Sequence, residues 1–237
     1  MFFRVLIINN NLKGKIMKTL SIISLSIIML ISCNYEKNKT FTFDDYEPGK
    51  IPSGWSQYAT GVNDTTDWRI MDDGGNKVLA QLSEEKDEDH FNEIVYDGLK
   101  VKNVELKVRI KPLHGETDQG GGFVWRFIDA DNHYIVRENP LEDNVVLYKM
   151  ENGERIDLPL VGKGRTYGVD VEPLGQDWNT LRLTVVDDLF TVYLNGKQLF
   201  QVKDETFKNA GKVGLWTKSD AVTHFDDFQV VSLDQEK

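Results

Sequence analysis

The chain has 237 residues, 28 of them basic and 38 acidic, which gives a formal net charge of −10 at pH 7. An acidic surface repels phosphate backbones, so the charge argues against nucleic acid as a partner. The single cysteine excludes an intramolecular disulfide, and the composition fits one domain with a sizeable core.

The N-terminal segment has the pattern of a secretion signal. Residues 1–32 contain no acidic residue, and Lys18 precedes an apolar run of about a dozen residues. This run is shorter than the ~20 residues that span a bilayer, and it matches the core of a signal peptide. The tetrapeptide "LISC", residues 30–33, resembles a bacterial lipobox. The resemblance implies cleavage before Cys33 and attachment of diacylglycerol to its thiol; the alternative is a cytosolic protein with an inert thiol.

The position of this signal sets the expected domain boundaries. Residues 1–33 form the signal peptide and lipobox, and Met17 is the expected start. Asn34 stands where an aspartate would signal retention in the inner membrane, so the lipobox pattern implies an outer-membrane lipoprotein. Cleavage leaves 24 basic and 38 acidic residues, a formal charge of −14. We expect residues 34–40 to be a tether and residues 41–237 to form a single β-sandwich domain.

The rest of the chain predicts short strands. In residues 104–111, four apolar residues alternate strictly with four charged ones, as in a strand with one buried face. Asn-Gly pairs at 152–153 and 195–196 predict type I′ hairpin turns. Other strand candidates are residues 77–82, 91–96, 144–158, 181–186, 189–194, 197–202, 211–216 and 223–233. The pattern predicts an all-β fold, a two-sheet antiparallel jelly-roll sandwich.

Four segments in this order carry a family resemblance: residues 43–55, 120–158, 178–199 and 223–230. Together they resemble the concanavalin A-like lectin/glucanase superfamily. They are most similar to bacterial 3-keto-disaccharide hydrolase-like domains, relatives of family 16 glycoside hydrolases. The resemblance implies a curved sandwich whose concave face meets carbohydrate. It implies no particular activity, because this fold hosts lectins, enzymes and structural modules.

Residues 122–128 and 133–139 predict a hairpin with Ala130-Asp131 at its tip. In this register Phe127 faces Tyr134 and Arg126 faces Ile135, and opposed residues share a face. One face is then aromatic and belongs to the core, with Phe123, Trp125, Phe127, Tyr134 and Val136. A one-residue change in the loop would alter this relation.

The other face of this hairpin carries Arg126, His133 and Arg137, which are candidate ligand-binding residues. A guanidinium offers a planar fork of donors to a carboxylate or to vicinal sugar hydroxyls. The alternative is that neighbouring carboxylates simply neutralise the two arginines, as Glu138, Glu142 or Asp143 could do.

Trp216 is a further ligand-binding candidate. Val213 and Leu215 take the inward phase of their strand and leave Trp216 the outward phase, where an indole could stack on a sugar ring. The alternative is a core tryptophan, which is the interpretation we prefer for Trp55, Trp68 and Trp178.

The sequence lacks the paired-carboxylate motif of family 16 glycosidases, whose alternation places two carboxyl groups on one face. The acids of residues 84–93 do not alternate with apolar residues and indicate a solvated loop. Glu138 and Glu142 flank Pro140 and could cooperate only if a loop brought them together; His224 is a third catalytic candidate. The Gly120–Gly122 run precedes a strand, so it indicates a turn or bulge rather than a phosphate loop.

Two pairs of aspartates suggest a structural ion. Asp44 and Asp45 lie near the first strand, and Asp226 and Asp227 lie in the last strand. The first and last strands of jelly rolls are often neighbours, so these carboxylates could bind a structural Ca²⁺. The alternative is that they cap strand ends.

The sequence therefore favours a lipid-anchored, extracytoplasmic protein that binds carbohydrate, with the membrane contacted only through its lipid. One rival is a glycoside or 3-keto-disaccharide hydrolase. The other is a structural or protein-interaction module without a small ligand.

Overall fold

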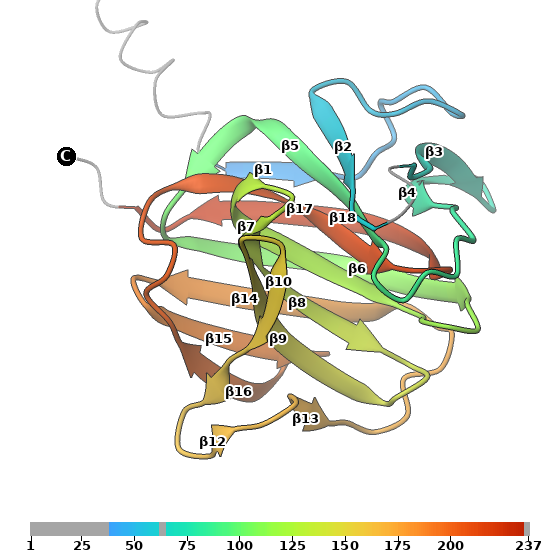
Figure 1. Cartoon of the computed structure of the whole chain (residues 1–237). Coiled ribbons are helices and arrows are strands. Elements are labelled where there is room, and N and C mark those ends of the chain that lie inside the picture. The colour runs from blue at the N-terminus through green and yellow to red at the C-terminus, as the bar shows by residue number, and fades with distance from the viewer. Residues whose placement is uncertain (1–37, 62–64, 235–237) are drawn as a thin grey trace, which may run out of the picture. The chain divides into compact units, whose positions relative to one another are not determined.

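The computed structural model describes residues 38–61 and 65–234, which form strands and turns in two antiparallel sheets (Figure 1). The predicted signal peptide, Cys33 and residues 34–37 lie outside this range. Within the described ranges, no helix has the length and apolarity needed to cross a membrane. The two sheets pack face to face, which confirms the predicted all-β sandwich.

The ten-stranded sheet has the order β12-β11-β16-β15-β14-β6-β18-β4-β3, and β1 also pairs with β18. Its strands are β1 (Asn38–Phe41), β3 (Trp68–Asp73), β4 (Asn76–Gln81), β6 (Val104–His114), β11 (Pro159–Leu160), β12 (Gly164–Arg165), β14 (Asn179–Val186), β15 (Leu189–Leu194), β16 (Lys197–Lys203) and β18 (Val222–Ser232).

The eight-stranded sheet faces the viewer in Figure 1 and has the order β10-β9-β8-β7-β17-β5-β2, with β13 paired to β9. Its strands are β2 (Trp55–Ala59), β5 (Phe91–Val101), β7 (Gly121–Asp129), β8 (Asn132–Asn139), β9 (Asn144–Glu151), β10 (Glu154–Asp157), β13 (Val169–Asp170) and β17 (Gly211–Lys218).

Local sequence signals placed most of these strands correctly. Both predicted hairpin turns have positive φ at their two central residues, 55° and 78° at Asn152 and Gly153 and 48° and 82° at Asn195 and Gly196. The predicted tether differs, because its last three residues belong to β1. There Asn38 pairs with Val231, so the first strand extends the sheet beside the last one.

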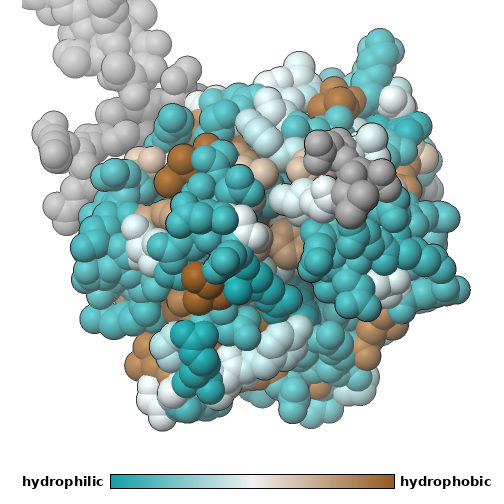
Figure 2. Space-filling model, in the orientation of Figure 1, coloured by the Kyte–Doolittle hydropathy of each residue, from teal (hydrophilic) through white to brown (hydrophobic). Residues whose placement is uncertain are grey.

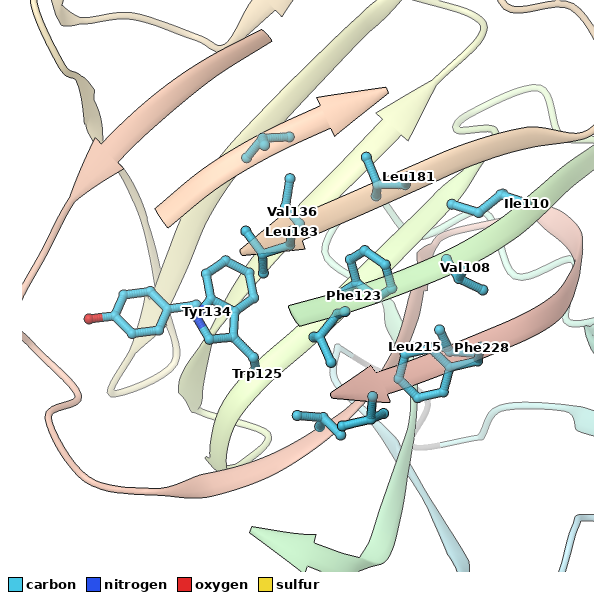
Figure 3. Packing of buried hydrophobic residues seen from close by; sticks show 14 of the residues in the cluster. Val108, Ile110, Phe123, Trp125, Tyr134, Val136, Leu181, Leu183, Leu215 and Phe228 are labelled. Atoms are coloured by element: carbon cyan, nitrogen blue, oxygen red, sulfur yellow. The ribbon is translucent and has the colours of Figure 1, made fainter. Parts of the chain in front are cut away.

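The core between the sheets is rich in aromatic side chains. Trp125 and Tyr134 stack with ring centroids 5.3 Å apart, and Figure 3 shows them side by side on neighbouring strands. Trp55 and Trp68 are buried, as the sequence predicts, whereas Trp178 is only partly buried, with Arg109 over its ring.

A second apolar cluster covers the outer face of the eight-stranded sheet. Its residues alternate along the strands with those of the core, so they point away from the ten-stranded sheet. We call it the outer-face cluster: Phe91, Val95, Val124, Phe127, Ile135, Val146, Tyr148, Met150 and Trp216. The strands β7, β8 and β9 are consequently buried on both faces.

The β7–β8 hairpin has the predicted tip but not the predicted register. Asp129 pairs with Asn132, yet the next pair is Trp125 with Tyr134, so three residues of β7 lie opposite His133 alone. Arg126 begins this bulge with a φ of 47°. The bulge moves Phe127 from the predicted core face to the outer-face cluster, where its ring lies 5.1 Å from that of His133.

Candidate functional site

The outer face of the eight-stranded sheet contains a pocket of about 460 Å³. We call it the outer-face pocket. Figure 2 shows this face of the molecule, hollowed near its centre and bordered by hydrophilic residues in teal. Its lining combines apolar side chains with charges of both signs: Thr60, Gly61, Glu88, Asp89, Phe91, Asp131, Met150, Gly153, Arg155 and Lys218. Six of these ten residues are polar or charged, and Phe91 and Met150 supply the apolar contact that small-molecule sites also offer.

Arg155 of β10 is a polar group of this pocket that contacts two aromatic rings and a carboxylate. Its Cζ lies 4.0 Å from the centre of the Tyr148 ring and 5.4 Å from that of the Tyr167 ring. Its Nε is 3.6 Å from a carboxylate oxygen of Asp157. Because two aromatic rings and a carboxylate fix its position, the guanidinium fork is already oriented for a ligand.

The acidic groups of the pocket come from two separate places in the chain. Glu88 and Asp89 belong to the segment before β5, and Asp131 lies at the β7–β8 tip. On the basic side, Lys218 lies 3.7 Å from a carboxylate oxygen of Asp118. The pocket therefore presents both hydrogen-bond donors and acceptors, the combination that suits vicinal hydroxyl groups.

Arg137 lies on the same outer face, buried beneath the surface. It donates hydrogen bonds to Asn144 at 2.5 Å, to Glu142 at 2.9 Å and to the Tyr167 hydroxyl at 2.9 Å. Partial burial favours a higher pKa for Glu142, but the charge of Arg137 and the hydrogen bonds from Arg137 and Asn144 together outweigh it and lower that pKa. The alternative in which a nearby carboxylate pairs with Arg137 thus has an ion pair in the structure, and the contact with Tyr167 brings Arg137 close to the pocket.

His133 is fully buried against Glu93, with its Nε2 2.8 Å from the carboxylate. Burial alone would lower the pKa of His133, but the charge of Glu93 and its hydrogen bond reverse the direction and raise it. The pair lies beneath the outer-face cluster rather than at the surface. His133 therefore packs under the outer-face cluster and is not in a position to touch a ligand directly.

Arg126 does not share a face with Arg137, contrary to the sequence prediction. Because the bulge gives Arg126 a left-handed backbone, its guanidinium turns toward Phe190 of the core, 5.5 Å away. It donates hydrogen bonds to the backbone carbonyls of Lys102, Asp187 and Phe207 and so joins three connections between strands. It lines a different, smaller pocket of about 270 Å³.

Trp216 takes the outward phase that its strand predicts, but it is not an exposed platform. The residue is 1% exposed and packs edge-on against Phe91, with ring centroids 5.2 Å apart. The sequence prediction failed because it equated the outward face with solvent, whereas the outer-face cluster buries that face.

The three catalytic candidates from the sequence lie apart. Glu138 points into the core between the sheets, where burial raises its pKa to about 8 despite the opposing charge of Arg137. Glu142 is exposed and pairs with the buried Arg137. His224 lies on the outer side of the ten-stranded sheet, 3.7 Å from Asp73. Burial lowers the pKa of His224, with Asp73 opposing. These residues do not form a catalytic group.

The aspartates proposed for calcium have other partners. Asp226 accepts a hydrogen bond from Asn76 at 3.0 Å, and Asp227 lies 3.3 Å from Arg109. Asp44 and Asp45 are exposed. Among the residues that the structure describes, no group of three or more histidine, cysteine, aspartate or glutamate side chains is arranged to hold a metal. A structural Ca²⁺ stays a prediction without support from this geometry.

Sequence reasoning missed most residues of the outer-face pocket. Glu88 and Asp89 belong to the stretch read as a solvated loop, and Lys218 ends a strand that was analysed only for Trp216. Arg155 carried a usable signal, because the Asn152-Gly153 turn sets the register that pairs it with Met150 on the outer face. What the sequence could not show is that a distant tyrosine covers this arginine.

Two comparisons place the chain among known proteins, and a third, with curated proteins, gave no significant match. The family model for the 3-keto-alpha-glucoside-1,2-lyase-like domain matches residues 40–231. This range includes every residue of the outer-face pocket.

Solved structures share the fold at low sequence identity. The carbohydrate-binding module CBM66 from Bacillus subtilis has 20% identity and a TM-score of 0.56, over 76% of this chain and 96% of that one. A GH43 protein, BlXynB, from Bacillus licheniformis has 13% identity and a TM-score of 0.53, over 84% and 40% of the two chains. A proposed glycosyl hydrolase from Parabacteroides distasonis has 19% identity and a TM-score of 0.50, over 84% and 95%.

Proposed function

Because the chain belongs to the family of 3-keto-alpha-glucoside-1,2-lyase-like domains, we propose that it binds carbohydrate in the outer-face pocket. The observation that carries the proposal is Arg155, whose guanidinium lies over the rings of Tyr148 and Tyr167 at the wall of that pocket. A fixed guanidinium can donate two hydrogen bonds to neighbouring sugar hydroxyls, while Phe91 and Met150 offer apolar contact to the ring carbons. Similarity of fold to a carbohydrate-binding module supports the same ligand class.

Replacing Arg155 with alanine is expected to weaken binding by at least about tenfold, because the loss of a charge-assisted hydrogen bond costs ~1.5–3 kcal/mol. A glycan array of the mature chain, followed by calorimetry on the best ligand, measures the effect. Arg182→Ala is the matched control, since Arg182 also stacks on a tyrosine, Tyr193 at 3.6 Å, but in the ten-stranded sheet. Equal carbohydrate binding by the Arg155 and Arg182 variants would rule out the outer-face pocket as the binding site.

The same samples separate the rival functions. The family description names a lyase, so α-glucosides and their 3-keto forms are incubated with the protein and analysed for products. Turnover of any of these substrates would favour an enzyme. Substitutions of the pocket residues would then be tested for their effect on that turnover. A folded chain that binds no glycan and turns over none of these substrates would favour the interaction module.

We further propose that the protein is a lipoprotein of the bacterial cell envelope, lipidated at Cys33 and located at the outer membrane. The apolar run and the "LISC" segment, residues 30–33, support this proposal. Mass spectrometry of the native protein is expected to find an N-terminal Cys33 carrying a diacylglyceryl group. A native protein that keeps Met1 or Met17 would contradict the anchor while leaving the carbohydrate proposal intact.

A further inference from the structure

We propose that Tyr167 forms a second sugar subsite beside the outer-face pocket, so that the site takes an oligosaccharide rather than one sugar ring. This inference rests on the proposed function and specifies the length of its ligand. Tyr167 lies between β12 and β13 and is 48% exposed. In the described part of the chain, it is the one aromatic residue among the exposed large hydrophobic side chains.

The backbone beside Tyr167 is fixed on the sheet. Gly168 has a φ of 73°, and a Cβ atom at this position would lie 2.3 Å from the carbonyl oxygen of Val145. Only glycine permits this approach. Val169 then pairs with Val145 in β9, so the segment rests directly on the edge of the eight-stranded sheet. Tyr167 is therefore held at one border of the outer face.

The side chain of Tyr167 is oriented by two arginines from that sheet. Arg137 donates a hydrogen bond of 2.9 Å to its hydroxyl and lies with its Cζ 5.9 Å from the ring centre. Arg155, which lines the pocket, lies 5.4 Å from the same centre. The ring and the pocket thus share an arginine, which places the exposed aromatic surface next to the first sugar position.

These contacts give Tyr167 the properties of a stacking platform. An aromatic ring packs against the C–H groups of a sugar, and a ring that is already fixed loses little side-chain freedom on binding. Tyr167 also covers Arg137, a role that needs no ligand. The two roles differ in one measurable respect, because only a subsite makes affinity depend on the number of sugar units.

Calorimetry with methyl α-glucoside and maltose tests the inference on the mature chain. We expect the wild type to bind maltose more tightly than methyl α-glucoside. Tyr167→Ala should bind maltose about three- to tenfold more weakly than the wild type does. Affinity for methyl α-glucoside should stay within about twofold. Tyr167→Phe, which keeps the ring, should retain most of the preference. Tyr193→Ala is the matched control, since Tyr193 also has an arginine over its ring, on the other sheet.

Several results would overturn the subsite. A wild type that binds maltose no tighter than methyl α-glucoside contradicts it, and so does a Tyr167→Ala variant that loses both affinities equally. A shared loss would instead show that Tyr167 supports Arg155. If the folded wild type binds neither sugar, the subsite as stated for α-glucosides fails, while the proposal of carbohydrate binding is decided separately by the glycan array. Melting curves of each variant show that the comparison is between folded proteins.

Discussion

Trp216→Ala is expected to lower the melting temperature by about 10 °C. Removing a buried aromatic side chain from a packed cluster costs ~3–5 kcal/mol, and each kcal/mol shifts the midpoint of a domain of this size by about 2–4 °C. Trp216 is 1% exposed and contacts Phe91 and Tyr148, with ring centroids 5.2 Å and 6.2 Å away. Its loss would leave a cavity beneath the outer-face pocket. Thermal unfolding followed by circular dichroism measures the shift.

The matched control is Trp178→Ala. Trp178 is partly exposed and packs against Arg109, whose Cζ lies 4.5 Å from its ring, so its removal opens no internal cavity. We expect its effect on the melting temperature to be a fraction of that of Trp216→Ala. If Trp216→Ala unfolded at the wild-type temperature but no longer bound carbohydrate, Trp216 would be the ligand platform that its strand phase first suggested.

The stability of the protein is expected to fall as the pH rises toward 9 because of Glu138. Its carboxyl group is fully buried between the sheets, and its oxygens lack a hydrogen-bond partner within the described structure. Burial raises the pKa of Glu138 to about 8, whereas the unfolded chain loses the proton near 4.5. The contribution of Glu138 to the free energy of unfolding is constant below pH 4.5. It declines as the pH rises from there and is lost above pH 8.

Glu138→Gln should remove this dependence. At ~1.4 kcal/mol for each unit between the two pKa values, the variant gains on the order of 4 kcal/mol relative to the wild type between pH 5 and pH 9. Urea denaturation across that range measures the difference. Glu142→Gln is the control, because the lowered pKa of Glu142 confines its effect to acid pH. Wild-type and Glu138→Gln curves that stay parallel from pH 5 to 9 would show that Glu138 is not buried as a neutral acid.

The sequence predicted what short-range rules decide. Alternation identified strands such as residues 104–111, and Asn-Gly pairs fixed two hairpins, because both signals act within a few residues. Burial of Trp55 and Trp68 also followed from their apolar character. The same rules failed at Arg126, where a bulge of three residues changed the register and sent its side chain to the core side of the hairpin.

The candidate site was harder to predict because it is assembled from distant segments. Glu88 and Met150 meet at one pocket only after the sheet has formed, and Tyr167 reaches Arg155 through a segment that crosses onto β9. The outward phase of Trp216 was read correctly, but period-two patterning does not reveal a second apolar layer. A sheet buried on both faces has almost continuous apolar strands. The position of the pocket depends on the outer-face cluster, which this pattern does not reveal.

The pairing of β1 with β18 has a consequence for how such a sandwich can be used. Asn38 lies opposite Val231, so the first and last strands end side by side. A fold whose ends adjoin can be inserted into a loop of another protein, or have its ends joined and be reopened elsewhere, without stretching the host chain. In the sequence, the pocket residues from Thr60 to Lys218 all fall after β1 and before β18. The domain could therefore be transplanted as a self-contained cassette with its site intact.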